Sequence, residues 1–75
     1  MRATDHNQFA ALRRAYDSLE QLGRIINRGR VTVCGRLQGA TPWKTTEKEL
    51  IIDDLIRRGI EKTKDPETFN KYFGG

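Results

Sequence analysis

The sequence predicts a small α+β domain: a long N-terminal helix, a short strand or hairpin, a second helix and a short C-terminal helix. Apolar residues recur at intervals of three and four near the start of the chain and again after residue 47, which is the spacing of one helix face. Between these segments, β-branched residues alternate with polar ones, as in a half-buried strand. The 75 residues hold no linker or repeat, so we expect one compact domain over 1–75.

The first helix is expected over about residues 6–28. Asp5 with Gln8 three residues later is typical of a capping box, and Gly29 is a natural stop because glycine accepts a left-handed backbone. The apolar residues also fit the a and d positions of a heptad repeat. Packing against the chain's own domain is the preferred interpretation. The alternative is a seam between copies of the chain, made by Phe9, Leu12, Tyr16, Leu19 and Ile26.

A strand or short hairpin is expected over about residues 30–41, in the sequence RVTVCGRL and the residues after it. Successive side chains of a strand point to opposite faces. One face would hold Val31, Val33 and Leu37, and the other Arg30, Thr32, Cys34 and Arg36. Because a lone strand leaves unpaired edges, it needs a return strand near residues 37–41 or a partner chain.

Two helices are expected in the rest of the chain. The longer one covers about residues 47–64, with Thr46 and Glu49 as its capping box. Its isoleucines fall on one broad apolar face. The opposite face carries the i,i+4 pairs Asp53–Arg57 and Asp54–Arg58, which predict an ordinary solvated surface.

The short C-terminal helix covers about residues 66–73, where Asp65 can act as the cap and Pro66 suits the first helical position. Its aromatic residues share one side and are expected to close the core: Phe69, Tyr72 and Phe73.

No motif of catalysis, metal binding or cofactor binding is present in the sequence. His6 lies in a polar N-terminal segment, and Cys34 falls in the expected strand, where a half-buried thiol is ordinarily inert. One histidine and one cysteine are too few for a common zinc site. Gly29 and Gly35 lack the spacing and the following lysine of a P-loop. We therefore expect no enzyme activity, no cofactor and no metal.

The charge balance is mildly basic, with 14 Lys and Arg against 10 Asp and Glu and a net charge of +4. The N-terminal segment is polar, and no apolar run approaches the roughly 18 residues of a membrane span. A soluble, cytoplasmic protein with no membrane partner is therefore expected. A chain this short buries only about 60% of its unfolded surface, so a homo-oligomer, dimer or larger, is expected to add stability.

The basic residues are concentrated in the middle of the chain. No carboxylate lies between Glu20 and Glu47, whereas four arginines lie between residues 24 and 39. Arg24 has a favourable i,i+4 partner in Glu20 and is therefore not counted among the candidate binding residues. Arginine suits bidentate phosphate contacts, and tryptophan can stack on a base. The candidate residues for binding an anion, a nucleic acid or a protein partner are Arg28, Arg30, Arg36, Lys44 and Trp43.

Three functions remain open from the sequence. The first is a non-catalytic binding or regulatory protein whose central basic segment contacts nucleic acid. The alternative is an inhibitor or adaptor, of the kind encoded by phages and mobile elements, whose basic patch docks on an acidic protein surface. A second alternative is a structural subunit of a larger assembly that uses the apolar stripe of the first helix. The arginines can also serve only to keep an edge strand from aggregating.

Overall fold

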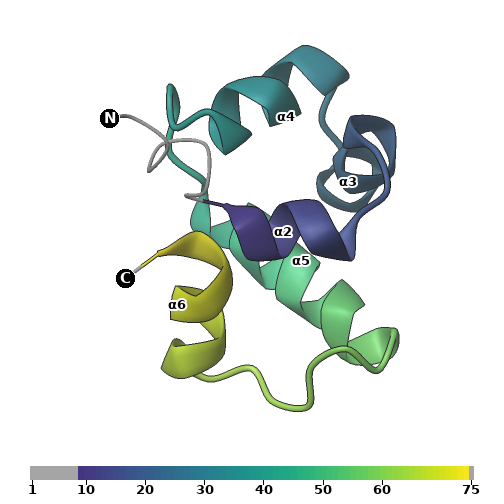
Figure 1. Ribbon diagram of the computed structural model, residues 1–75, viewed down its shortest axis with the longest axis vertical. Coiled ribbons are helices and arrows are strands. Elements are labelled where there is room, and N and C mark those ends of the chain that lie inside the picture. Colours follow the sequence, from purple (N-terminus) through teal and green to yellow (C-terminus); the bar gives the residue numbers. More distant parts are fainter. Residues whose placement is uncertain (1–8, 75) are drawn as a thin grey trace.

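The protein is built from helices around one core (Figure 1). The computed structural model describes residues 9–74, and this part of the chain contains no strand, so the predicted α+β class is wrong. The element order is α2 (Ala10–Ala15), α3 (Leu19–Ile26), α4 (Arg30–Leu37), α5 (Thr45–Arg57) and α6 (Pro66–Phe73). The helix α5 packs against both α3 and α6, and α2 also packs against α6.

The first predicted helix is divided into α2 and α3 by an extended residue, Tyr16. A new helix begins after it because Ser18 acts as an N-cap, its Oγ accepting a hydrogen bond from the Gln21 backbone N–H at 3.1 Å. The Tyr16 hydroxyl donates to Asp54 on α5 at 2.8 Å. This long-range bond holds the extended residue in place. The predicted cap at Asp5 and Gln8 lies outside the described residues.

The predicted strand over 30–41 is the helix α4, followed by a turn and a loop. Val33, Arg36 and Leu37 are buried, and their spacing of three and four is that of an inward helix face. The same segment alternates polar and β-branched residues, so both periods fit it. Packing of the inward face on the rest of the core overrides the β-propensity of the valines.

The residues proposed as an oligomer seam are part of the protein's own core. Four of them are less than 9% exposed, and Leu19 is partly buried against the same cluster. The preferred interpretation, packing within the domain, therefore describes these side chains, and the divided helix offers no continuous heptad seam. The buried hydrophobic residues are Phe9, Leu12, Tyr16, Leu22, Ile26, Val33, Leu37, Trp43, Ile51, Ile52, Leu55, Tyr72 and Phe73.

An aromatic cluster joins the two ends of the described chain. The Trp43 ring lies edge-on to Phe9, with ring centroids 5.9 Å apart, and edge-on to Phe73, at 5.4 Å. Edge-to-face pairs of this kind contribute about 0.5–1.5 kcal/mol beyond their buried area. Trp43 therefore closes the core at the entry to α5.

The start of α5 lies earlier than predicted. Its first residue is Thr45, and the capping carboxylate is Glu47, which accepts a hydrogen bond from the Lys44 backbone N–H at 3.1 Å. The predicted box of Thr46 and Glu49 is thus wrong. The predicted end near residue 64 is also wrong, because the helix ends at Arg57, before Gly59 with its positive φ of 81°. Residues 58–65 form a loop.

One carboxylate on the charged side of α5 is buried instead of solvated. Asp54 is 5% exposed and accepts hydrogen bonds from the Tyr16 hydroxyl and from Arg57. Burial, with the bond to Asp54, raises the pKa of Tyr16 well above its ordinary value. Arg58 pairs with Asp54 as predicted, at 3.6 Å. The predicted pair of Asp53 with Arg57 is wrong, because Arg57 pairs with Asp54, and Asp53 pairs with Lys64 at 3.0 Å.

The beginning of α6 matches the sequence prediction. Asp65 caps the helix by accepting from the Thr68 backbone N–H at 2.9 Å, and Pro66 is the first helical residue. The Tyr72 hydroxyl donates to Glu61 at 2.6 Å and so ties α6 to the preceding loop. Burial, followed by the bond to Glu61, raises the pKa of Tyr72 to about 12.

Candidate nucleic-acid interface

The helices α3 and α4 are joined by a tight turn of three residues, 27–29. Asn27 has a left-handed backbone, with φ of 58°, and its N–H bonds the Gly23 carbonyl. Asn27 therefore ends α3 in place of the predicted Gly29, which is the N-cap of α4. The Arg28 N–H bonds the same carbonyl at 2.9 Å. A Cβ atom on Gly23 would lie 2.6 Å from the Arg28 carbonyl oxygen. The turn therefore returns over α3 at a point where only glycine fits without a shift.

The helix α4 lies at the end of the molecule opposite to the loop before α6 (Figure 1). In that view α3 is seen nearly end-on and α4 runs across the picture, so the two helices cross steeply. One face of α4 packs inward, whereas Arg30, Val31 and the C-cap Gln38 are exposed. Thr32 and Cys34 are partly exposed. Within residues 9–74, the outward face of α4 is therefore exposed at its first turn and at its C-cap and partly exposed between them.

A buried carboxylate holds this unit on α5. Glu47 is 1% exposed. Its Oε1 accepts from Arg36 Nε at 2.7 Å, and its Oε2 accepts from Arg36 Nη2 at 3.1 Å and from Arg28 Nε at 3.0 Å. Arg28 belongs to the turn and Arg36 to the last turn of α4, so one side chain pins both ends of α4. Such two-point arginine–carboxylate pairs are geometrically specific.

The pKa of Glu47 reflects two opposed causes. Burial raises the pKa of this carboxyl group, because the charged form loses its hydration. Hydrogen bonds from Arg36, from the Lys44 backbone and from Arg28 favour the charged form, and together they hold the pKa below its usual value of 4.5. Glu47 is therefore a permanent anion at neutral pH.

The five binding residues predicted from the sequence do not form one surface. Arg36 is 7% exposed and Trp43 is 8% exposed, so neither can reach a ligand. The prediction failed for Arg36 because a helix, unlike a strand, turns its side chain inward to Glu47. Trp43 belongs to the aromatic cluster. Arg30 and Lys44 are exposed, and the Arg28 side chain is 42% exposed beside Glu47.

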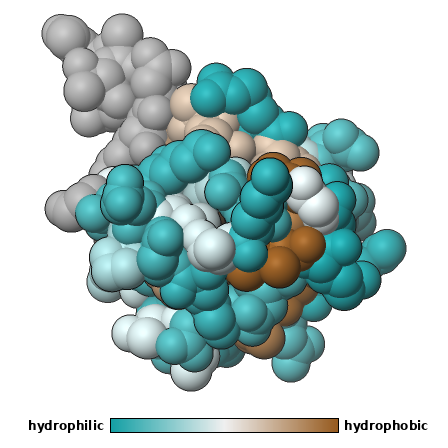
Figure 2. All heavy atoms as spheres, turned by 90° about the horizontal axis from the view of Figure 1, so that it is seen from below, coloured by the Kyte–Doolittle hydropathy of each residue, from teal (hydrophilic) through white to brown (hydrophobic). Residues whose placement is uncertain are grey.

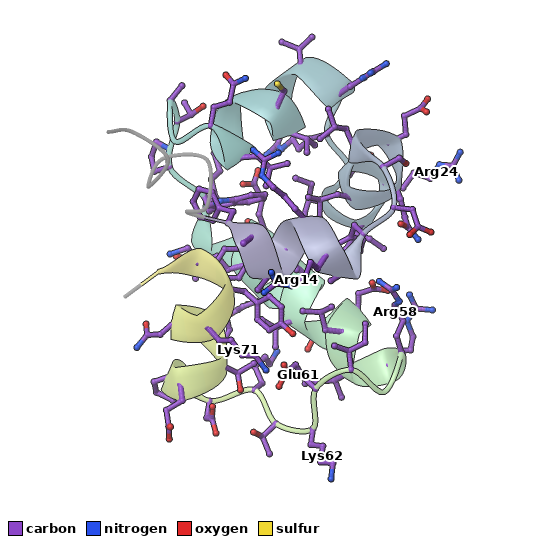
Figure 3. All side chains as sticks on the ribbon, in the orientation of Figure 1. Arg14, Arg24, Arg58, Glu61, Lys62 and Lys71 are labelled. Atoms are coloured by element: carbon purple, nitrogen blue, oxygen red, sulfur yellow. The ribbon has the colours of Figure 1, made fainter. Side chains whose placement is uncertain are left out.

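Two exposed residues beside Arg30 were missed by sequence reasoning. Arg24 was assigned to an ion pair with Glu20, yet it extends away from α3 into solvent (Figure 3). Val31 was assigned to the apolar face of the strand and is 87% exposed. The helical spacing of Val33, Arg36 and Leu37 was the available signal, since it turns residues 30 and 31 outward.

An open hollow of about 450 Å³ lies at the junction of α3 and α4. Three arginines line it, Arg24, Arg28 and Arg30, together with Glu20. Guanidinium groups in such a setting suit the oxygens of a phosphate group. The face at the other end of the molecule, seen in Figure 2, is mostly hydrophilic around one apolar patch.

Comparisons with protein-family models, with curated proteins and with solved structures each find no match for this chain. Within residues 9–74, no group of three or more His, Cys, Asp and Glu side chains is placed to hold a metal ion. No helix in this part of the chain is long and apolar enough to cross a membrane. His6 lies outside the described residues, and the absence of enzyme activity and of a cofactor stays a prediction.

Proposed function

We propose that this protein binds double-stranded DNA, with α3 and α4 acting as a helix-turn-helix unit whose second helix enters the major groove. DNA-binding units of this type join two steeply crossing helices by a turn of three or four residues that often contains glycine. The turn 27–29 has this length and contains Gly29. The observation that carries the proposal is this unit, held rigidly by Glu47, with the outward face of α4 open.

The charge distribution supports the same partner. The segment between Glu20 and Glu47 holds five basic residues and no acid. Glu47 folds back onto this segment, where it neutralises Arg36 and is shared with Arg28. Arg24, Arg30 and Lys44 remain exposed, and with the exposed part of Arg28 they give the surface a positive charge. Phosphate contacts of such residues dominate the affinity of DNA-binding proteins.

Single-stranded nucleic acid and duplex RNA fit this surface less well than duplex DNA. Stacking on single-stranded bases needs exposed aromatic side chains, and Trp43, the chain's one tryptophan, is buried. The major groove of duplex RNA is too deep and narrow for side chains to read. A protruding helix beside arginines matches the major groove of B-form DNA.

Fluorescence anisotropy with labelled nucleic acids at several salt concentrations tests the proposal. The expected order of affinity is duplex DNA above duplex RNA of the same sequence and above the single strands. The Arg30→Ala variant should weaken duplex DNA binding by roughly tenfold, the worth of one lost arginine contact to DNA. The matched control is Lys62→Ala, which removes the same charge from the loop at the opposite end of the molecule from α4 (Figure 3).

Two results would overturn the proposal. One is the absence of duplex DNA binding at low salt by a folded protein. The other is an equal loss of affinity in Arg30→Ala and Lys62→Ala, because the attraction would then be a property of the net charge alone. Binding of an acidic protein surface in place of DNA would favour the inhibitor or adaptor function instead.

The expected homo-oligomer remains a proposal as well. The described part of one chain presents one such helix, and two copies would read two half-sites about one helical turn apart, roughly 34–36 Å. Footprinting on a selected DNA site would reveal one protected region or two.

A further inference from the structure

Val31 is an exposed apolar side chain that the fold does not explain. Its exposed fraction of 87% exceeds that of Leu50, at 46%, and of Ile60, at 44%. Valine is a poor helix former because its branched side chain loses rotamer freedom against the preceding turn. At the second position of α4 it neither packs on the core nor favours the helix.

The surroundings of Val31 restrict the partner that could cover it. Arg30 precedes it on the same helix and is exposed, and Arg24 and Arg28 line the hollow at the start of α4. An apolar site inside this cationic surface needs a partner that is anionic and also carries a small apolar group. In the major groove of DNA, the C5-methyl group of thymine is that group, between two phosphate backbones.

The position of Val31 along α4 agrees with this partner. In helix-turn-helix proteins the N-terminal residues of the second helix contact the base edges. Arg30 and Val31 are the first two residues of α4. Neighbouring residues of a helix project about 100° apart. Arg30 can therefore reach phosphate or guanine while Val31 faces an adjacent base pair.

We propose that Val31 contacts the C5-methyl group of a thymine and makes this protein prefer thymine at one position of its DNA site. This inference rests on the proposed function. It concerns specificity, because a polar residue at position 31 would leave the phosphate contacts of the arginines in place. Leu50 is the matched exposed apolar residue; it belongs to α5 and does not line the hollow at the α3–α4 junction.

The test begins with selection of preferred sites from a random duplex library by the wild-type protein. Each thymine of the selected site is then replaced by deoxyuridine, which lacks only the methyl group. One replacement should weaken binding by roughly three- to fivefold, the worth of one buried methyl group. For Val31→Ala, the same thymine and uracil duplexes should bind equally well, whereas Leu50→Ala should keep the full difference. Since Val31 is exposed and alanine is the better helix former, the thermal midpoint of its alanine variant should be no lower than that of the wild type.

The possible failures are distinguishable. If the folded protein selects no site and binds no duplex DNA, both the proposed function and this inference are overturned. If a site is selected but every uracil replacement is tolerated, only the inference about Val31 is overturned. A loss on uracil replacement that is the same in Val31→Ala and in the wild type also overturns it, because another residue would then contact the methyl group.

Discussion

Replacing Glu47 by glutamine should destabilise the whole domain. The substitution keeps the shape of the side chain and the acceptor for Lys44 but leaves the buried Arg36 without a counter-charge. Removing one partner of a buried ion pair costs about 3–5 kcal/mol. A domain of this size has an unfolding free energy of about 4–11 kcal/mol, at 0.05–0.15 kcal/mol per residue. Glu47→Gln should therefore remove a large share of the stability.

Thermal unfolding followed by circular dichroism measures this loss. With about 4–8 °C per kcal/mol for a domain of this length, Glu47→Gln should lower the midpoint by about 12 °C or more. The control is Asp53→Asn on the same helix, because its pair with Lys64 is exposed on both sides. Surface pairs of that kind contribute about 0–1 kcal/mol. Equal midpoints for the two variants would refute the anchoring role of Glu47.

A second variant separates the buried charge from the packing around it. Arg36→Met together with Glu47→Gln removes both charges and keeps similar volumes. The double variant leaves no uncompensated charge at position 36, and the amide at position 47 can still accept from the Lys44 backbone N–H, so it should recover part of the lost stability. If the double variant is as unstable as Glu47→Gln alone, the loss does not come from the uncompensated arginine.

Three further results are expected. Folding raises the pKa of both tyrosines, Tyr16 and Tyr72, so the folded protein should show no tyrosinate absorbance at pH 10. Its free energy of unfolding should fall as the pH rises above 10. A normal tyrosine titration near pH 10 would contradict this. Asn27→Ala should lower the free energy of unfolding in urea by about 1 kcal/mol, since a left-handed backbone costs an ordinary residue about 1–2 kcal/mol. Asn27→Gly should leave this free energy unchanged. Equal losses in the two variants would contradict the turn geometry. Gly23→Ala should cost about 1–3 kcal/mol by overpacking against the Arg28 carbonyl, and an unchanged urea midpoint would contradict that contact.

Acid should lower the stability of the fold by protonating Glu47. The pKa of Glu47 is lower in the folded chain than the 4.5 of an unperturbed group. The contribution of Glu47 to the free energy of unfolding is therefore complete above pH 4.5. It is lost progressively as the pH falls from there through the lower folded pKa. Glu47→Gln should therefore show a shallower loss of stability with acid, measured as urea midpoints between pH 6 and 3. Parallel curves for the two proteins would contradict the shift.

The part of the fold that local sequence determines was predictable. The cap at Asp65 and Pro66 needs only neighbouring residues, and the structure confirms it. The apolar face of α5 is confirmed for Ile51, Ile52 and Leu55, whereas Ile60 lies beyond the end of the helix and is exposed. The segment 30–37 was ambiguous because alternation and helical spacing both fit it. Its helical state depends on contacts across the fold, which are the packing of Val33 and Leu37 on the core and the pair of Arg36 with Glu47.

Two of the five predicted site residues, Arg36 and Trp43, are buried for the same physical reason. An ion pair between residues far apart in the chain leaves no local pattern, so the sequence could not show that Arg36 is neutralised or that Trp43 is buried. The exposure of Arg30 was predictable, because an arginine without acidic neighbours in the sequence is expected to lie at the surface. Its neighbour Val31 became visible as an unusual residue only when the inward face of α4 was known.

The aromatic cluster of Phe9, Trp43 and Phe73 has a consequence for the folding and the proteolysis of the protein. Its members come from the beginning, the middle and the end of the described chain, so this part of the core cannot close until residue 73 has been synthesised. Contacts of such long sequence separation slow folding. A protease that removed α6 alone would open the cluster from one side. It would thereby loosen α5, against which α6 packs, and with it Glu47, which holds both ends of α4 although the protease never touched α4.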